Sequence, residues 1–164
     1  MSLALIPGSF DPFTLGHVNL VERTAKLFDR VVVAIMVNGE KNDTGGGCFT
    51  FVERAAIAAA SLAHLDNVEV ITDSGILVEL AERIGATALV KGVRGVGDFD
   101  YEYTLAQINR RLPPTVETLL LPADSVYDHI SATMVRDLLR HGRIPEGCLH
   151  PAAMALIKSI KFKN

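Results

Sequence analysis

The sequence predicts an α/β fold: one domain, residues 1–164, in which an open parallel sheet of about five strands carries helices on both faces. Three observations predict it. Apolar runs of strand length alternate along the chain with segments whose apolar residues follow the helical period. The run at Val31–Val37 is almost wholly apolar, as in a parallel strand covered on both faces. The length of 164 residues, 49% of them apolar, suits one well-formed core and is too short for two.

The N-terminal elements come in the order strand, helix, strand. Leu3–Ile6 is a short apolar run that ends at a Pro-Gly pair, which predicts a buried strand followed by a turn. Val18–Phe28 has apolar residues at helical spacing and predicts the first helix. Val31–Val37 is then the second strand.

The middle of the chain continues the alternation. The segment Thr50–Glu53 has the spacing of a capping box, which predicts a helix through the Ala-rich stretch to about Ala63. Val68–Ile71 predicts the third strand. Ile76–Ile84 predicts a helix that ends at Gly85, because glycine is favoured just after the last helical turn.

The C-terminal part predicts two more strands and three helices. Ala88–Val90 is the fourth strand, and a glycine-rich turn follows it. Asp98 is expected to cap a helix that two prolines stop after residue 112. Val116–Leu121 is the fifth strand, and helices are expected to begin at Ser131 and at Pro151.

Composition excludes several classes of function. The net charge is −3 and the 16 Lys and Arg residues are spread along the chain, whereas a general nucleic-acid binder carries a basic stripe. The longest apolar runs are shorter than a membrane span, and the start lacks the pattern of a signal peptide. Cys48 and Cys148 lie far apart without metal-ligand spacing, so we expect reduced thiols in a cytoplasmic protein.

The first candidate motif, residues 7–17 (PGSFDPFTLGH), leaves a strand, turns tightly and enters a helix. Gly8 and Gly16 allow the backbone to approach a ligand closely. Thr14 can cap the helix, and the free N–H groups of its first turn favour a phosphate. His17 then lies beside that phosphate and can stabilise charge that develops on it. An isolated histidine with this spacing would more often be an ordinary solvent-facing side chain.

Three further clusters follow the second, fourth and fifth strands. Lys41 stands in a glycine-containing loop, where a lysine reaches a phosphate as a mobile point charge. Lys91–Arg94 is a glycine turn whose arginine can contact phosphate oxygens with two N–H groups, and Glu102 on the next helix can accept from a sugar or a base. Ser131 is a good helix cap, which predicts another anion site. Ligands of open parallel sheets bind beyond these strand ends.

The motifs together resemble a known family. Residues 7–17 are similar to the Thr/His-x-Gly-His motif of the nucleotidyltransferase superfamily, which includes the class I tRNA synthetases. Lys91–Arg94 followed by DFDYE at 98–102 resembles paired blocks of the bacterial phosphopantetheine adenylyltransferases, with Val93 in place of leucine. Tyr127–Thr133 resembles their Ile-Ser-Ser-Ser/Thr segment, with Ala132 in place of the middle serine. The likeness runs through nearly the whole chain.

The resemblance implies a Rossmann-like fold and an enzyme that transfers the adenylyl group of ATP to 4′-phosphopantetheine, giving dephospho-CoA and pyrophosphate. It implies catalytic roles for His17, Lys41 and Arg94. It implies substrate contacts for Ser9, Lys41, Leu77 and Lys91. It implies ATP contacts for the residues of four segments: Ser9, Phe10, His17, Gly92, Val93, Arg94, Glu102, Tyr127, Asp128, His129, Ile130, Ser131, Ala132 and Thr133.

The same resemblance implies a homohexamer inhibited by coenzyme A. No metal ligands are expected from the protein, because the carboxylates form no obvious cage, so Mg²⁺ would be held mainly by the ATP phosphates. Two alternatives stay open. A related transferase could act on glycerol phosphate or nicotinamide mononucleotide, although the residues at 91–94 and 98–102 argue against both. A non-catalytic ATP-sensing module would need the phosphate loops but not His17 and Lys41 together.

Overall fold

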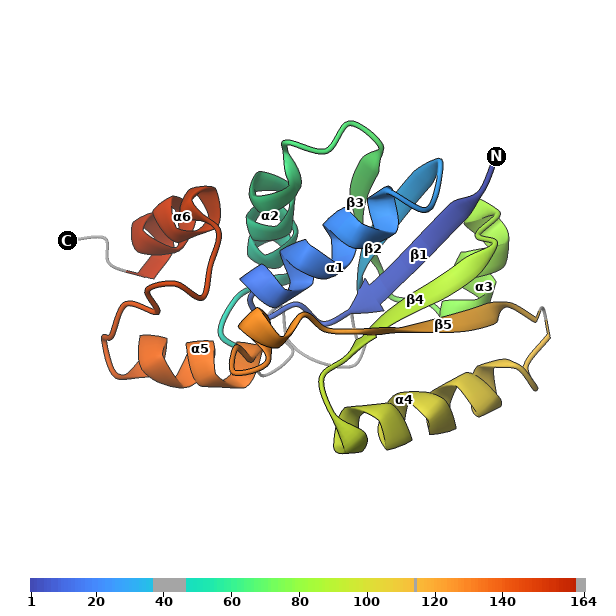
Figure 1. Cartoon of the computed structure of the whole chain (residues 1–164). Helices are drawn as coiled ribbons and strands as arrows, with labels where there is room; N and C mark the ends of the chain where they lie inside the picture. Colours follow the sequence, from blue (N-terminus) through green and yellow to red (C-terminus); the bar gives the residue numbers. More distant parts are fainter. Residues whose placement is uncertain (37–46, 114, 162–164) are drawn as a thin grey trace.

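Five parallel strands form one open sheet in the order β3–β2–β1–β4–β5 (Figure 1). The structure, a computed structural model, describes residues 1–36, 47–113 and 115–161. The strands are β1 Leu3–Gly8, β2 Arg30–Met36, β3 Val68–Asp73, β4 Ala88–Val93 and β5 Glu117–Pro122. The helices are α1 Leu15–Ala25, α2 Phe51–Leu62, α3 Leu77–Ile84, α4 Val96–Asn109, α5 Ala132–Arg140 and α6 Pro151–Lys161, with a short 3₁₀ turn η1 at Ser125–Tyr127. The predicted fold class is confirmed.

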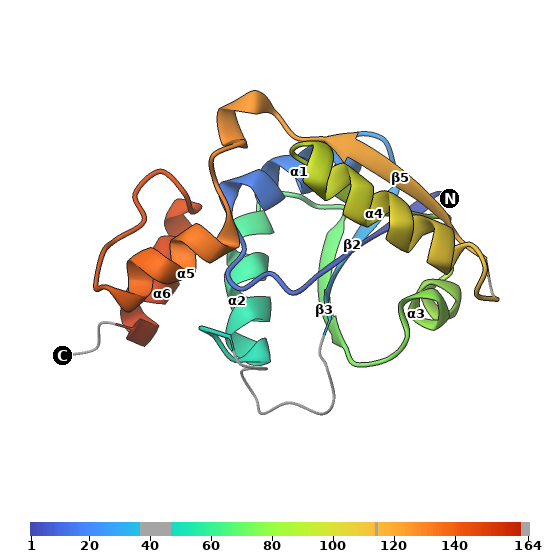
Figure 2. The same cartoon turned by 90° about the horizontal axis from the view of Figure 1, so that it is seen from below.

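The strand order determines which helices cover each face. The chain runs outward from β1 through β2 to β3, then crosses to the other side of β1 and continues through β4 to β5. Right-handed crossovers place helices on opposite faces when the direction of winding reverses. Accordingly α1 and α2 pack on one face and α3 on the other, and α4 lies along β4 and β5 (Figures 1 and 2). The reversal lies between β1 and β4, where ligands of such sheets bind.

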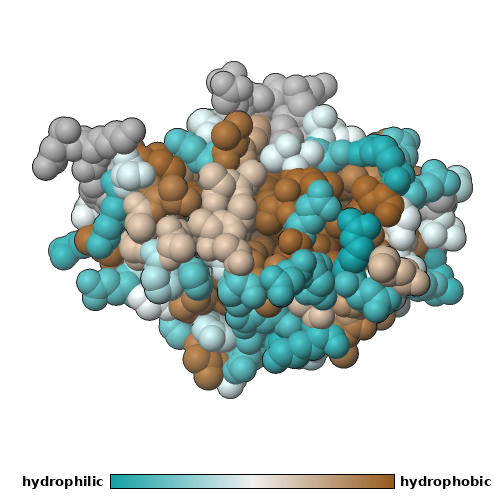
Figure 3. All heavy atoms as spheres, turned by 90° about the horizontal axis from the view of Figure 1, so that it is seen from above, coloured by the Kyte–Doolittle hydropathy of each residue, from teal (hydrophilic) through white to brown (hydrophobic). Residues whose placement is uncertain are grey.

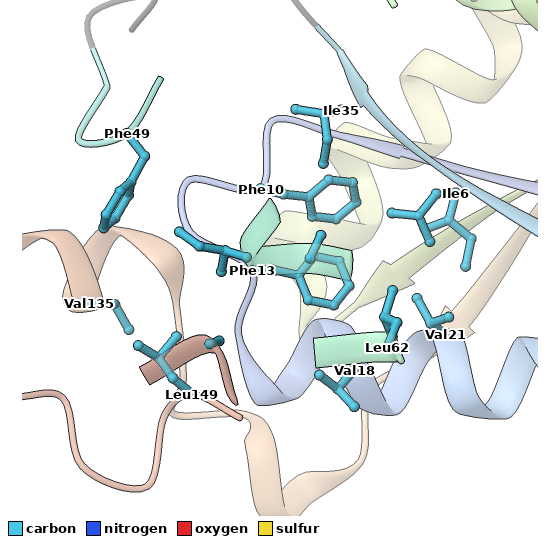
Figure 4. Packing of buried hydrophobic residues seen from close by; sticks show 14 of the residues in the cluster. Ile6, Phe10, Phe13, Val18, Val21, Ile35, Phe49, Leu62, Val135 and Leu149 are labelled. Atoms are coloured by element: carbon cyan, nitrogen blue, oxygen red, sulfur yellow. The ribbon is translucent and has the colours of Figure 1, made fainter. Parts of the chain in front are cut away.

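The larger core lies between the sheet and helices α1, α2, α5 and α6. Successive strand residues point to opposite faces, so Ile6 and Ile35 face this core while Leu5 joins the smaller one under α3. Phe10 and Phe13, from the segment after β1, insert their rings into the larger core beside Ile6 and Val21 (Figure 4). The segment that was predicted to bind phosphate is therefore anchored by two buried aromatic rings.

Helix ends follow the local signals in three cases. Thr50 and Glu53 form the predicted capping box, with the Glu53 N–H donating to Thr50 Oγ1 over 3.2 Å. Gly85 ends α3 with φ of 70°, a left-handed conformation that favours glycine. Ser131 caps α5 by accepting a hydrogen bond from the Met134 N–H over 3.1 Å.

Three expectations, about α1, α4 and the glycine-rich turn, need correction. Helix α1 begins at Leu15 and ends at Ala25, not Phe28. Asp98 does not cap α4, because Gly95 is the N-cap and the Asp98 carboxylate instead accepts hydrogen bonds from Arg94. Gly92 lies inside β4 and not in the turn after it.

Large apolar side chains are exposed to solvent along α4 and β5. No residue of α4 is buried, and its sheet neighbour β5 is an edge strand. The large apolar residues exposed on these two elements and the adjoining turn are Val96, Phe99, Tyr101, Tyr103, Ile108, Leu112 and Leu119. Elsewhere, on the face shown in Figure 3, exposed hydrophobic atoms near the centre are surrounded by hydrophilic ones. Within the described residues, no helix is both long and apolar enough to cross a bilayer.

Candidate active site

A cleft of about 460 Å³ opens where β1 and β4 separate. The two strands pair only at Ala4 with Ala88 and at Leu5 with Leu89, whereas β1 pairs with β2 along its full length. Beyond Leu5 the backbones of β1 and β4 diverge, and residues 6–8 and 90–92 line the gap between them. The sheet therefore provides a binding site at its carboxyl edge, at the reversal of strand order.

His17 stands in this cleft in a defined tautomer. Its Nδ1 accepts a hydrogen bond from the Thr14 N–H over 3.0 Å, so the ring proton is on Nε2 when the imidazole is neutral. The rings of Phe10 and Phe13 lie 5.0 and 5.2 Å from the imidazole, centre to centre, and fix its plane. Burial, helped by the positive charges of Arg94 and Lys91, lowers the pKa of His17 from 6.5 to about 4. At neutral pH the side chain is thus a neutral donor.

The loop Ser9–Asp11 runs along one wall of the cleft. Phe10 has a φ of 43°, unusual for a residue other than glycine, while its ring stays buried in the core. Gly8 is required beside it, because a Cβ at that position would lie 2.7 Å from the Phe10 ring. With its ring turned inward, Phe10 can contact a ligand in the cleft through its backbone, which is compatible with the ATP contact that the resemblance implies.

A buried ion pair holds this loop against the segment before α2. The Asp11 carboxylate accepts the N–H groups of Cys48 and Phe49 over 2.8 and 3.0 Å. Arg54 lies 3.4 Å from the same carboxylate and donates to the carbonyl of Ser9 over 3.3 Å. Both side chains are about 5% exposed, so the charges are compensated inside the protein.

Lys91 and Arg94, from the turn that follows β4 in the sequence prediction, line the cleft, and each is paired with a carboxylate of α4. Lys91 lies 3.3 Å from Glu102 and donates to the Pro7 carbonyl over 3.4 Å. Arg94 donates to Asp98 over 2.9 Å and to the Ile130 carbonyl over 3.3 Å. The hydrogen bond from Arg94 lowers the pKa of Asp98. One oxygen of Glu102 is buried with no partner among the described residues, which leaves an acceptor available in the cleft.

The N-terminus of α5 also borders the cleft. Tyr127 and the residues Ile130–Thr133 line it, and α5 begins at Ala132. Helix N-termini attract anions through the free N–H groups of their first turn. The cleft therefore combines a neutral imidazole, four cationic side chains (Arg23, Lys91, Arg94 and Arg136) and a helix N-terminus, a set of groups suited to a polyphosphate.

Comparison with known proteins agrees with this geometry. Residues 5–138 match the family model described as cytidylyltransferase-like. The chain is 41% identical over 158 residues to the phosphopantetheine adenylyltransferase of Psychromonas ingrahamii, across 96% of this chain and 93% of the relative. The chain belongs to the phosphopantetheine adenylyltransferase family.

Solved structures at lower identity support the fold. A putative nicotinate-nucleotide adenylyltransferase from Vibrio parahaemolyticus superposes with a TM-score of 0.70 at 18% identity, covering 96% of this chain and 99% of its own. A bifunctional NMN adenylyltransferase/ADP ribose pyrophosphatase from Francisella tularensis gives 0.71 at 15% identity, over 97% of this chain and 49% of its own. The fold of this chain thus resembles that of two other adenylyltransferases. The family match and the sequence identity show that the chain is a nucleotidyltransferase.

Most residues predicted from family resemblance come together in the cleft. Those that line it are Ser9, Phe10, His17, Lys91, Gly92, Arg94, Glu102, Tyr127, Ile130, Ser131, Ala132 and Thr133. Val93, Asp128 and His129 are near neighbours in sequence but are not among the lining residues. Leu77 begins α3 and packs against the smaller core. Lys41 and the loop of residues 42–47 lie outside the described residues, apart from Gly47.

The sequence analysis missed several lining residues. Asn19, Leu20 and Arg23 come from α1, Tyr101 from α4, and Arg136 from α5. Asn19, Leu20 and Arg23 lie within two turns after His17, so the helical period could have placed some of them on its face. Arg136 lies one turn after Thr133, so the same period could have placed it beside the predicted anion site. Its contact with Asp11 depends on tertiary packing and has no local signal.

The described residues provide no ready-made metal cage. No three His, Cys, Asp or Glu side chains in this part of the chain are grouped closely enough to hold an ion. The two carboxylates that line the cleft, Asp98 and Glu102, are each paired with a cation.

Proposed function

We propose that this chain transfers the adenylyl group of ATP to 4′-phosphopantetheine, producing dephospho-CoA and pyrophosphate. The name of the relative from Psychromonas ingrahamii supports this substrate pair. The observation that carries the chemistry is the hydrogen bond from the Thr14 N–H to Nδ1 of His17, which leaves Nε2–H as a donor in a cleft that also holds Lys91 and Arg94.

The reaction is an in-line displacement at phosphorus. An oxygen of the phosphopantetheine phosphate forms a bond to the α-phosphorus of ATP, the bond from that phosphorus to the bridging oxygen of the β-phosphate breaks, and pyrophosphate leaves. A phosphate dianion is already a nucleophile, so no general base is needed. Catalysis then consists of positioning and charge stabilisation.

Each wall of the cleft has a role in this proposal. His17 donates from Nε2 to a non-bridging oxygen of the α-phosphate, and Lys41 assists from its own loop. Ser9 and Phe10 offer backbone N–H groups, and Ser9 serves both substrates. Arg94 and the N-terminus of α5 bind the β- and γ-phosphates.

The remaining predicted contacts complete the two substrate sites. Glu102 accepts from the ATP sugar or base through its unpaired oxygen. Lys91 and Leu77 act on the phosphopantetheine side. ATP enters as its Mg²⁺ complex, with the ion held by phosphate oxygens and water.

Assembly and regulation form a second part of the proposal. We infer a homohexamer, supported by the uncovered apolar side chains of α4 and β5, since patches of this kind mark association surfaces. Coenzyme A is proposed as a feedback inhibitor because it shares the pantetheine arm of the substrate. The cytoplasm is the proposed location, where Cys48 and Cys148 would remain reduced.

A pyrophosphate-release assay with ATP and 4′-phosphopantetheine tests the reaction. A panel with CTP and glycerol phosphate, and with ATP and nicotinamide mononucleotide, separates it from the related transferases. Release only with ATP and 4′-phosphopantetheine is the expected result. ATP binding without pyrophosphate release for any acceptor would instead favour a non-catalytic sensor.

A further inference from the structure

Arg136 joins its own helix to a loop residue that lies 125 positions earlier in the chain. Its Nη1 donates to the Asp11 carbonyl over 2.7 Å, and its Nη2 donates to Thr133 Oγ1 over 2.9 Å. Asp11 belongs to the loop after β1, and Thr133 belongs to the first turn of α5. The loop after β1 and the start of α5 are therefore connected through one guanidinium group, which itself lines the cleft.

The loop after β1 is the segment that needs such support. Phe10 has a positive φ, a conformation that persists only where the surroundings impose it. Arg54 fixes the carbonyl of Ser9 on one side of Phe10, and Arg136 fixes the carbonyl of Asp11 on the other. Since a peptide group is planar, fixing the Ser9 carbonyl toward Arg54 also turns the Phe10 N–H to the opposite side.

We propose that Arg136 is a positioning residue for adenylyl transfer, which holds the Ser9–Asp11 loop at a fixed distance from the N-terminus of α5. This inference rests on the proposed function of the same cleft. The planar guanidinium suits the task because it donates to two acceptors in a fixed geometry, which a lysine cannot do. The role is to set the separation of the groups on either side of the α-phosphate, and not to bind phosphate itself.

Three variants separate positioning from other roles. Arg136→Met keeps much of the side-chain length and removes both hydrogen bonds. Arg136→Lys restores one donor that can reach Asp11 or Thr133. Arg140→Met is the matched control, because Arg140 lies on the same helix, is exposed, and bonds within the described residues to Asp137 of its own helix.

The first measurement is amide hydrogen exchange of the Ser9–Thr14 segment in each full-length protein without ligands. We expect faster exchange in Arg136→Met than in the parent protein, an intermediate rate in Arg136→Lys, and no change in Arg140→Met. Unchanged exchange in Arg136→Met would overturn the proposal. Hydrogen exchange needs no turnover, so it tests the positioning of the loop independently of the reaction. Absence of pyrophosphate release by the parent protein would reject the proposed function and not the positioning role.

The second measurement separates kcat from nucleotide binding. A misplacement of about 1 Å costs on the order of a hundredfold in rate, so kcat of Arg136→Met at saturating substrates should fall by about 10- to 100-fold. The Kd of ATP by calorimetry should change much less, and Arg136→Lys should recover part of kcat. A weakened Kd with an unchanged kcat would overturn the proposal, because it would make Arg136 a phosphate ligand.

Discussion

At the scale of single residues, the two nitrogens of His17 have different tasks. Nδ1 accepts a hydrogen bond from the Thr14 N–H and so contributes to the stability of the fold. Nε2 remains as a donor in the cleft, where the proposed reaction uses it. The amide oxygen of asparagine can take the place of Nδ1, and the amide nitrogen of glutamine can take the place of Nε2. Two substitutions at one position can therefore test the two tasks separately.

His17→Asn should keep the thermal stability close to that of the parent protein but lower kcat by about a hundredfold or more, the typical loss for one donor to a developing charge. His17→Gln should retain more activity and less stability. Pyrophosphate release and thermal unfolding measure the two effects. Equal activity in the Asn variant and the parent protein would remove His17 from the chemistry.

The depressed pKa of His17 predicts how stability depends on pH. The unfolded chain binds a proton near pH 6.5, whereas the folded protein resists protonation until about pH 4. The unfolded state thus carries more protons between these values, and stability must fall as the pH drops from 6.5 to 4. Above pH 6.5 His17 is neutral in both the folded and the unfolded state, so it no longer lowers the free energy of unfolding.

Urea unfolding of the parent protein and of His17→Asn at pH 7.5, 5.5 and 4.5 measures this effect. Because asparagine does not titrate, the parent protein should lose more free energy of unfolding than the variant as the pH falls. Parallel curves for the two proteins would contradict the assigned pKa.

The Asp98 carboxylate accepts a hydrogen bond from Arg94 Nε over 2.9 Å. If Arg94 binds phosphate as proposed, this carboxylate competes with the nucleotide for it. Asp98→Asn removes one negative charge from the cleft and should tighten ATP binding about fivefold, the effect of roughly 1 kcal/mol between close charges in water. Calorimetric titration with ATP measures it, and Asp100→Asn, on the same helix but not lining the cleft, is the control. Weaker ATP binding in Asp98→Asn would show instead that the carboxylate orients Arg94 for its ligand.

At the scale of secondary-structure elements, the cap of α5 affects both folding and binding. Ser131→Ala removes the acceptor of the Met134 N–H and should lower the free energy of unfolding by about 1 kcal/mol. ATP affinity should change little, because the backbone N–H groups of the first turn remain. Ser131→Asn, which restores a capping side chain, should recover the stability in chemical denaturation. A large loss of ATP affinity at full stability would mean that the hydroxyl itself binds the nucleotide.

The elements whose signals are local were predictable from the sequence. The capping box of α2, Gly85 and the five apolar strand runs depend on neighbouring residues, and all appear in the structure. The start of α4 was mispredicted because Asp98 has a strong capping preference, but the Arg94 side chain competes for its carboxylate. Sequence pattern alone does not show which of two partners such a carboxylate takes.

At the scale of the whole molecule, the apolar residues of α4 predict how the proposed hexamer is held together. Phe99 and Ile108 are 50% and 49% exposed in the single chain, so replacing both with serine should change the stability of one subunit only slightly. The same change should weaken association by removing apolar contact area. Size-exclusion chromatography with light scattering should then show a smaller particle than the parent protein.

Leu27→Ser is the matched control for this experiment. Leu27 is 68% exposed but lies between α1 and β2, away from α4. Its replacement should leave the particle size unchanged. If the double variant of α4 keeps the parent mass, the association surface lies elsewhere.

Part of the site was predictable from the sequence, because many of its residues directly follow the carboxyl ends of strands. Open parallel sheets bring the carboxyl ends of their strands together, so motifs that follow β1, β4 and β5 had to meet. The depth of the cleft was not predictable, because it depends on how soon β1 and β4 stop pairing. Arg136 was not predictable either, since its contacts with the loop depend on how α5 packs against the rest of the protein.

The 125-position separation of Arg136 and Asp11 also has a consequence during synthesis. A ribosome completes the histidine-bearing motif early, long before it reaches the arginine that steadies that motif. Until then the growing polypeptide has a nucleotide-facing loop with nothing to hold its far side. Chains that end before α5 would therefore lack the contact that holds the Asp11 carbonyl.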